Sequence, residues 1–282
     1  FMETGRTSCG DPDNPGNLQN QPRAPGVREC YIPAEGNVYV ACDYDTAELR
    51  ALAQVLYTWF GWSKMRDAII AGRDIHEDVA ANLDWLDRQG AKPFNFGLPG
   101  GLGNATLIKF VKSYTGGKVI LSRKEAQEAR DAWFRTWPEM RLYFDRISEF
   151  TASGKARMKA HWSGRYRGGM SFSQAANGMF QSLVADGAKK ALAAVAKACY
   201  TSGHVLSRFK PVAFIHDEII LEGPEEHAPR AAQALEDIMI SEMQVVMPDV
   251  PVTASSHLMR RWYKSAKPVY RDGVLVPWEP GV

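Results

Sequence analysis

The chain has 282 residues, of which 45% are hydrophobic and 11% aromatic, so it can form a packed core in one or two lobes. Its formal net charge of +2 does not indicate a nucleic-acid partner, so any basic surface has to be local. The four cysteines form no Cys-x-x-Cys pair, which argues against structural zinc, and neither a signal peptide nor an apolar run of about 18 residues points to export or a membrane. We expect a globular protein with free thiols in a reducing compartment.

The first segment of distinct composition is 8–26, which is dense in Pro, Gly, Asn and Gln and predicts an extended loop. Side-chain amides suit the minor groove of a duplex, where all base pairs present similar acceptors. An ordinary surface loop would have the same composition.

A buried strand is predicted over 38–42, where five apolar residues end abruptly at Asp43. A helix-forming run rich in Ala and Leu follows. A carboxylate at a strand end is held rigidly and can point into a cleft, as a metal ligand must. The simpler interpretation makes Asp43 a loop acid, with Asp45 and Glu48 as a helix-capping box.

Helical patterns fill 49–150, and one of them carries a stripe of functional side chains. Arg88, Lys92 and Phe96 recur every four residues, so they share one face of a helix. Two cations suit a triphosphate, and an aromatic ring suits a base or a sugar. A solvated helix face would show the same spacing. Pro99 and the glycines around it end this helix.

The remaining elements follow from periodicity and from cap and turn residues. We expect helices near 105–114, at 122–150 with an interruption at Pro138, and at 181–199 and 225–246; a strand at 250–254; and a hairpin at 269–276.

A basic segment lies between residues 150 and 185, which contain no Asp or Glu. Its cations are Lys155, Arg157, Lys159, Arg165 and Arg167. A surface of one sign suits the phosphates of a nucleic acid, so this segment supplies the local basicity that the net charge conceals.

A second strand-end acid lies in 211–222, where two apolar segments flank His216, Asp217 and Glu218. This pattern predicts a tight hairpin with acids at its tip. Together, Asp43 and Asp217 could hold two Mg²⁺ ions about 3.5–4 Å apart, an arrangement that serves phosphoryl transfer.

Three segments, in this order, resemble the motifs of family A DNA polymerases, which have palm, fingers and thumb subdomains. Residues 43–50 match Asp-Tyr-Ser-x-Ile-Glu-Leu-Arg, residues 88–97 match Arg-x-x-x-Lys-x-x-Asn-Phe-Gly, and residues 215–218 match Val-His-Asp-Glu. Flanking matches extend the resemblance over about 4–266; they are Thr4–Ser8, Asn17–Asn20, Gly72–His76, and Asn177 with Gln181.

The resemblance implies an α+β fold: a palm with an antiparallel sheet and an inserted helical fingers subdomain. We expect palm residues at 1–50 and 151–266, fingers at 51–150, and a C-terminal extension of unknown role at 267–282. Because Phe1 is an unnatural beginning, we expect thumb and exonuclease-like domains upstream in a longer polypeptide. The cytoplasm of a bacterial cell or a phage-infected host is the implied location.

The implied activity is template-directed DNA synthesis with two Mg²⁺ ions, primer-template DNA and deoxynucleoside triphosphates. The implied catalytic residues are Asp43, Asp217, Glu218 and Lys92; Asp43, Asp217 and the Tyr44 carbonyl hold metal; and Arg88, Lys92, Phe96, Glu48 and Tyr44 bind the nucleotide. The implied DNA contacts are Arg6, Gln19, Asn20, Asn177, Gln181, Arg165 and His216. A purely structural role is the alternative for His216.

Two departures from the family pattern carry expectations. Pro93 cannot lie in a regular helix interior without a kink, so the second motif's helix is expected to start late and to leave Arg88 in a loop. Gly100 stands where relatives carry a Tyr that pairs with the Glu of the first motif. Glu48 is therefore expected to lack its partner, unless Tyr114 fills the gap, and discrimination against ribonucleotides is expected to be weaker.

Two other functions remain open at this stage. A single-subunit RNA polymerase shares the palm and the His-Asp pair, although the residues around Asn95 and Glu218 favour the DNA enzyme. A nonenzymatic nucleic-acid-binding subunit is disfavoured because both acids and Lys92 are present. Ribonucleotide incorporation and Mg²⁺-dependent primer extension discriminate between these functions.

Overall fold

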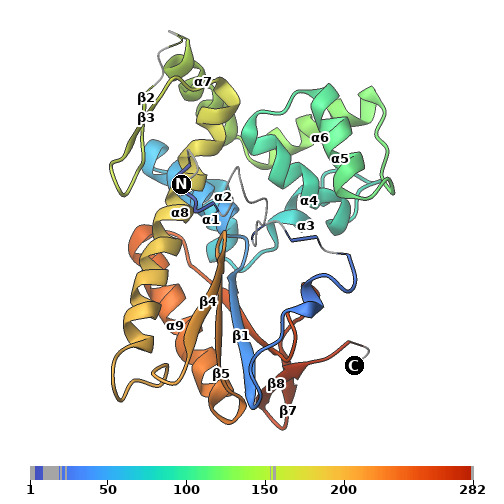
Figure 1. Ribbon diagram of the computed structural model, residues 1–282. Helices are drawn as coiled ribbons and strands as arrows, with labels where there is room; N and C mark the ends of the chain where they lie inside the picture. Colours follow the sequence, from blue (N-terminus) through green and yellow to red (C-terminus); the bar gives the residue numbers. More distant parts are fainter. Residues whose placement is uncertain are drawn as a thin grey trace, which may run out of the picture. The chain divides into compact units, whose positions relative to one another are not determined.

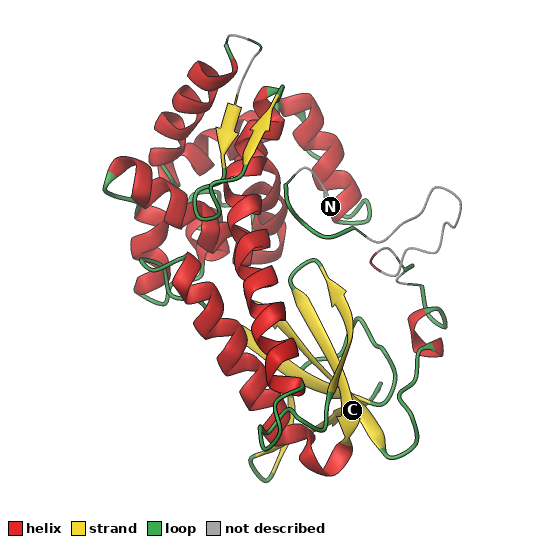
Figure 2. Cartoon of the chain, turned by 60° about the vertical axis from the view of Figure 1, so that its left-hand side comes forward, coloured by secondary structure: helices red, strands yellow, loops and turns green. Residues whose placement is uncertain are grey.

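The computed structural model describes residues 4–8, 19, 21–22, 24–152, 154 and 157–280. They form two compact units. The sheet unit combines 1–47, 184–246 and 252–282, and the helical unit combines 48–183 with 247–251. Most strands belong to the sheet unit, whereas the helical unit contains one small hairpin among its helices (Figure 2).

The sheet unit is built on six strands in the order β4-β5-β1-β6-β8-β7. The strands are β1 Asn37–Tyr44, β4 Lys210–Ile215, β5 Glu218–Pro224, β6 Ala254–Met259, β7 Val269–Arg271 and β8 Val274–Trp278. All neighbouring pairs are antiparallel except β6 and β8. The predicted α+β fold, with a helical unit inserted in the chain after the first strand, is confirmed.

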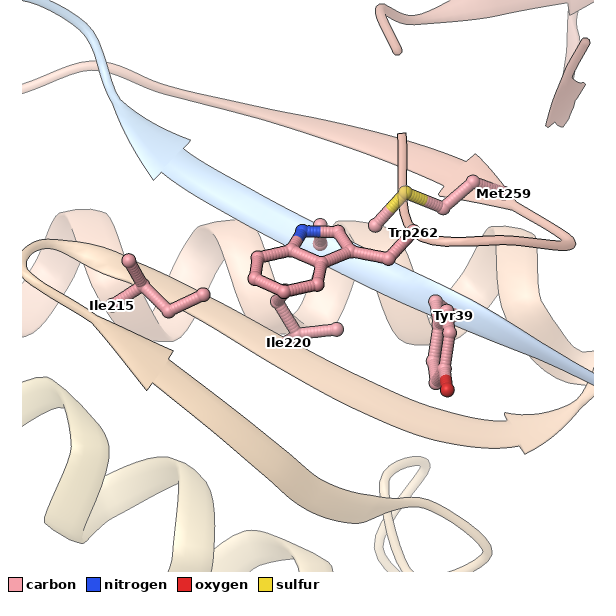
Figure 3. Close-up of a cluster of buried hydrophobic side chains, with 6 residues drawn as sticks. Tyr39, Ile215, Ile220, Met259 and Trp262 are labelled. Atoms are coloured by element: carbon pink, nitrogen blue, oxygen red, sulfur yellow. The ribbon is translucent and has the colours of Figure 1, made fainter. Parts of the chain in front are cut away.

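The two faces of β1 have different partners because side chains alternate along a strand. One face is covered by helix α9, Ala228–Val246 (Figure 1). There the Tyr44 hydroxyl donates to the Met239 carbonyl at 2.7 Å. On the other face Tyr39 and Ala41 pack in a cluster completed by Ile215, Ile220, Met259 and Trp262 (Figure 3). Asp43 follows on this second face.

The helical unit contains most of the helices and a two-stranded hairpin. Its elements are α1 Ala47–Phe60, α2 Lys64–Ile70, α3 Ile75–Ala80, α4 Arg88–Gly97, η3 Leu98–Gly100, α5 Asn104–Tyr114, α6 Arg123–Thr136, α7 Glu139–Thr151, β2 Arg157–Lys159, β3 Tyr166–Gly168 and the start of α8 Phe172–Cys199. The predicted capping box of Ser122 and Glu125 opens α6, and Pro138 separates α6 from α7. Trp133, Trp137 and Tyr143 are fully buried in its core.

The unit boundaries differ from the expected subdomain limits, most of all at the second limit. Contacts divide the chain after Ala47 and after Leu183, whereas the sequence suggested limits at 50 and 150. Residues 151–183 group with the helical unit because the start of α8 packs on α7, where the Tyr143 hydroxyl donates to the Ala176 carbonyl at 2.5 Å.

Two C-terminal elements also refine the expectations. The strand predicted at 250–254 is instead β6, which begins at Ala254, because Pro251 lacks the N–H that a ladder needs. The predicted hairpin forms as β7 and β8, and β8 joins the sheet beside β6.

Candidate active site

The end of β1 presents Asp43 to a pocket of the sheet unit. In the pairing of β1 with β5, Ala41 faces Ile220 and Cys42 faces Ile219, so the next step of the register brings Asp43 beside Glu218. Both acids line a pocket of about 470 Å³. Two carboxylates on neighbouring strands are thus held on one face by the backbone ladder.

The predicted hairpin between β4 and β5 adds the third acid. His216 and Asp217 form its two-residue turn, which the pairing of Ile215 with Glu218 closes. The φ angle of His216 is 61°, in the left-handed region that two-residue hairpin turns require and that Gly or Asn usually occupies. The turn holds Asp217 in the same pocket as Asp43.

The electrostatics of this pocket favour a cation. Burial raises the pKa of the Asp43 carboxyl, while the charge of Lys264 and the Tyr44 backbone N–H act in the opposite direction. The Asp43 Oδ1 atom is buried and has no hydrogen-bond partner among the described residues. Lys264 Nζ lies 3.8 Å from Glu218 Oε2. A buried carboxylate oxygen without a partner is energetically unfavourable until a cation approaches it.

These donors fit magnesium. In proteins Mg²⁺ keeps several waters and takes one or two carboxylates together with substrate phosphates. Within the described part of the chain, no three His, Cys, Asp or Glu side chains form a ready metal cage. Asp43 and Asp217 would therefore supply part of a coordination shell that substrate and water complete.

Three polar residues of the pocket lie outside every motif. Arg28 is buried; its Nη2 donates to the Gln21 carbonyl at 2.9 Å, and its guanidinium carbon lies 4.5 Å from the centroid of the Trp262 ring. Gln21, Arg28 and Lys264 line the pocket with the acids. Only the requirement that clustered carboxylates have nearby cations could have suggested Arg28 and Lys264 from the sequence.

The Tyr44 side chain does not line this pocket. Its ring packs toward α9, where the hydroxyl is bonded to Met239, and burial raises its pKa. The alternation of the strand turns the Tyr44 ring away from Asp43, and the nucleotide contact expected of Tyr44 stays a prediction. Its backbone remains beside the acid.

The expected DNA contacts of the sheet unit are placed in part. Gln19 lines the acidic pocket, and its Nε2 donates to Thr7 Oγ1 at 2.9 Å and to the Phe214 carbonyl at 3.2 Å. His216 lines the same pocket. Arg6 is half-buried, and Asn20 lies outside the described residues.

In the helical unit, α4 presents the predicted stripe. Between Gly90 and Gly97 all residues are buried except Lys92 and Phe96, and Arg88 is also partly exposed. The helix begins at Arg88, because the Asp87 side chain accepts a hydrogen bond from the Gly90 N–H at 2.7 Å.

Pro93 therefore lies inside α4, and the expectation of a late start is wrong. The cap before Pro93 and the packing of Asn95 after it hold the helical path, so one missing backbone hydrogen bond does not end the helix.

Asn95 fixes α4 to its neighbours. Its Nδ2 donates to the Ile75 carbonyl at 2.9 Å and lies 3.0 Å from His76 Nδ1. Its Oδ1 accepts from the indole N–H groups of Trp133 at 2.9 Å and Trp137 at 3.4 Å. One buried amide thus joins α3, α4 and α6, and orients the stripe that α4 carries.

Arg88 is already paired within this unit. Its Nη2 lies 2.6 Å from Asp74 Oδ2, and Asp74 also caps α3. Burial alone would raise the pKa of Asp74, but hydrogen bonds from Arg88 and from the His76 and Glu77 backbone bring it below its usual value. Burial lowers the pKa of His76 to about 4, and Arg88 and Lys92 act in the same direction. His76 is therefore neutral at pH 7.

Packing explains why position 100 is a glycine. A Cβ at this position would lie 2.5 Å from Asn177 Nδ2, so no larger residue fits without moving Asn177. On the same face of α8, Gln181 Nε2 donates to Glu48 Oε1 at 3.4 Å. The expectation that Glu48 lacks a partner is wrong, because an amide of α8 takes that place.

Tyr114, which was considered as a replacement partner for Glu48, contacts Phe96. Its ring centroid is 6.1 Å from that of Phe96, which in turn is 5.6 Å from His76. Phe96 is thus supported on two sides, while Glu48 is held by α8.

The basic segment folds as the β2–β3 hairpin and the residues around it. Arg165 is exposed, and its Nε donates to Ser163 Oγ at 3.0 Å. Lys155 lies outside the described residues.

The chain belongs to DNA polymerase family A, whose sequence model matches residues 1–264. It is 30% identical to DNA polymerase I of Aquifex aeolicus, with 93% of this chain and 44% of that protein covered. It is 28% identical to the thermostable DNA polymerase I of Thermus filiformis, with 93% and 31% covered. The chain thus spans less than half the length of these relatives.

Among solved structures, the fold is similar to the polymerase domain of Pol1 from M. smegmatis, in a complex with DNA primer-template and dNTP. The TM-score is 0.72 at 24% identity, and the match covers 93% of this chain and 46% of that one. Polymerases of family A are generally metal-dependent. In the described part of the chain, no helix has the length and apolar character needed to cross a membrane.

Proposed function

We propose that this chain carries out template-directed DNA synthesis, in which the primer 3′-hydroxyl attacks the α-phosphate of a deoxynucleoside triphosphate and pyrophosphate leaves. The observation that carries the proposal is the pocket of Asp43, Asp217 and Glu218, where a buried Asp43 oxygen has no hydrogen-bond partner in the part of the chain that the structure describes. Membership of family A and the relatives named DNA polymerase I support it.

Two Mg²⁺ ions are the proposed cofactors, with Asp43, Asp217 and the Tyr44 carbonyl as protein ligands. When bound, such ions activate the attacking oxygen and stabilise the leaving one. Glu218 supports the ligands from the neighbouring strand, and Lys264 neutralises the acids before metal arrives.

The nucleotide is the proposed ligand of the α4 stripe. Lys92 supplies a catalytic positive charge to the departing phosphates, because it is half-exposed on a helix that Asn95 fixes. Arg88 takes a secondary part, since Asp74 already holds its guanidinium. Phe96 offers a ring to the sugar or base, and Glu48 meets the 2′ side of the sugar.

Primer-template DNA is the proposed partner. Amides and cations of both units suit the minor groove and the phosphates of a duplex. The proposed contacts are Arg6, Gln19, Asn20, Asn177, Gln181, His216 and Arg165. Because the relatives are bacterial enzymes, we further propose that the protein works in the cytoplasm of a bacterial cell or a phage-infected host.

Primer extension with Mg²⁺ tests this function. Asp43→Asn and Asp217→Asn keep the side-chain shape but remove a charge, so extension should fall by about a thousandfold or more while DNA binding stays within about twofold. Asp272→Asn, in the β7–β8 turn, is the matched control and should extend normally. Activity retained in either active-site variant, or equal use of ribonucleotides and deoxynucleotides by the parent, would contradict the proposal.

A further inference from the structure

The β2–β3 hairpin of the helical unit exposes two aromatic rings among cations. Tyr166 is 73% exposed and Trp162 is 46% exposed. Tyr166 lies opposite Lys159 in the register, and Lys159 Nζ is 5.8 Å from the centroid of its ring. Large exposed rings on an ordered hairpin indicate a binding surface rather than a core.

The turn of this hairpin is ordered by its own backbone. The Ala160 N–H donates to the Arg165 carbonyl at 2.7 Å, and the Gly164 N–H donates to the Ala160 carbonyl at 3.0 Å. Gly164 has φ = 69°, so the tight return depends on a glycine there. Trp162 is therefore presented by a closed turn.

A cavity of about 210 Å³ lies between this hairpin, α7 and α8 of the same unit. Its apolar lining includes Trp59, Phe150 and Met158. The Arg146 guanidinium carbon lies 4.6 Å from the centroid of Trp59 and 5.9 Å from that of Phe150. Arg157 also lines the cavity. The cavity thus combines flat apolar surface with positive charge.

The charge of the surroundings selects the ligand. The sequence from 150 to 185 has no acidic residue, while Arg157, Lys159, Arg165 and Arg167 lie on the same hairpin as the rings. Cations alone would suit any duplex, but rings bind bases only where the base faces are open. Cations with exposed rings are the combination that binds single-stranded nucleic acid.

The cavity size narrows the ligand further. Pockets for drug-sized ligands occupy about 300–1,000 Å³, so a cavity of about 210 Å³ suits one flat ring system rather than a whole nucleoside triphosphate. Met158, Met170 and Met179 in its wall can adapt to any of the four bases.

We propose that the β2–β3 hairpin binds the unpaired template strand. Bases stack on Trp162 and Tyr166, phosphates lie along Arg165 and Arg167, and one unstacked base enters the cavity beside Arg146. This proposal rests on the proposed function only where it identifies the bound strand as a template. The binding of single-stranded DNA itself requires neither metal nor catalysis.

Fluorescence anisotropy with two labelled DNAs tests the proposal. One is a blunt duplex, and the other is the same duplex with a 5′ template overhang of about eight nucleotides. The parent should bind the overhang DNA more tightly. The double variant Trp162→Ala/Tyr166→Ala should lose about tenfold or more in affinity for the overhang DNA and keep its affinity for the blunt one.

The control is Tyr270→Ala, which removes a ring that is 65% exposed in the sheet unit and should bind both DNAs like the parent. Equal losses on both DNAs would show that the hairpin contacts duplex, and no loss on either would show that it does not bind DNA. Both results would overturn the proposal.

Photo-crosslinking identifies the residues. A 5-iodouracil in the overhang should crosslink to Trp162 or Tyr166, and crosslinks confined to other residues would overturn the proposal. Asp43→Asn separates this proposal from the proposed function: it should abolish extension yet keep the overhang preference. Loss of the overhang preference in the hairpin variant supports the hairpin site whether or not the parent extends primers. A parent that prefers overhang DNA but never extends primers would contradict only the proposed function.

Discussion

The sheet unit and the helical unit hold their candidate functional groups in opposite ways. In the sheet unit, backbone pairing brings Asp43 and Glu218 together, and a buried Asp43 oxygen has no hydrogen-bond partner among the residues that the structure describes. In the helical unit, two of the groups described above have side-chain partners: Arg88 is paired with Asp74, and Glu48 with Gln181. The first arrangement keeps charge unsatisfied until a cation arrives, and the second orients side chains in advance.

This difference teaches where each unit is sensitive. A β-ladder places the acids whatever their charge, so substitution there should change chemistry more than folding. Side-chain hydrogen bonds place the α4 stripe, so substitution there should change folding and orientation together.

The largest effect on stability should come from Asn95. Asn95→Ala leaves the Ile75 carbonyl and two indole N–H groups buried without their partner, so the free energy of unfolding should fall by about 3 kcal/mol. Urea denaturation measures it. Asn104→Ala, which breaks an exposed hydrogen bond to Gln127, is the control and should change stability by less than about 0.5 kcal/mol. A small effect of Asn95→Ala would mean that backbone packing alone orients α4.

Lys92 should matter more than Arg88 for nucleotide use. Lys92→Ala removes an available cation, so kcat/KM for the nucleotide should fall about a hundredfold, while Arg88→Ala removes a guanidinium already engaged by Asp74 and should cost about tenfold. Steady-state kinetics on a saturating primer-template measures both. Losses of equal size would contradict the idea that Asp74 withholds Arg88 from the triphosphate.

The next prediction uses the buried imidazole of the helical unit. The pKa of His76 is lowered from 6.5 to about 4 in the folded protein. Between these values the unfolded chain binds more protons than the folded one, so stability rises with pH there. The contribution is present above pH 6.5 and is lost as pH falls toward 4.

His76 should therefore contribute about 2–3 kcal/mol at neutral pH. The free energy of unfolding of the parent should decrease by that amount between pH 7 and pH 4.5, and His76→Gln should flatten the curve. His257 in the sheet unit has a pKa lowered to about 4 by burial and then by Lys264, so His257→Gln tests the same effect in the other unit. A His76→Gln curve as steep as that of the parent would show that other groups carry the pH dependence.

Local patterns of sequence predicted the acidic site well for a physical reason. Strand alternation and the closing of a two-residue turn depend on neighbouring residues, and these placed Asp43 and formed the hairpin that carries Asp217. Arg28 and Lys264 reach the same pocket through distant packing, which no local pattern encodes.

The helical unit was predicted less well, because its details depend on partners far along the chain. Contact with Asn177 explains why position 100 is a glycine, and the bond from Gln181 explains what holds Glu48. Only the folded protein brings these residues together. Pro93 shows the same limit in another form: the local preference against a proline inside a helix is overridden by the Asp87 cap and by Asn95.

The smallest predicted effect tests the tether of Glu48. Gln181→Ala frees the Glu48 carboxylate, so Glu48 should exclude a 2′-hydroxyl less effectively. The ratio of kcat/KM for a deoxynucleotide over its ribonucleotide should fall about fivefold, which corresponds to about 1 kcal/mol for one hydrogen bond. Glu48→Ala should lower the ratio further, and the double variant should match Glu48→Ala alone because Gln181 acts through Glu48. If the two effects instead add, Gln181 acts directly on the DNA or the nucleotide, and some other contact positions the Glu48 carboxylate.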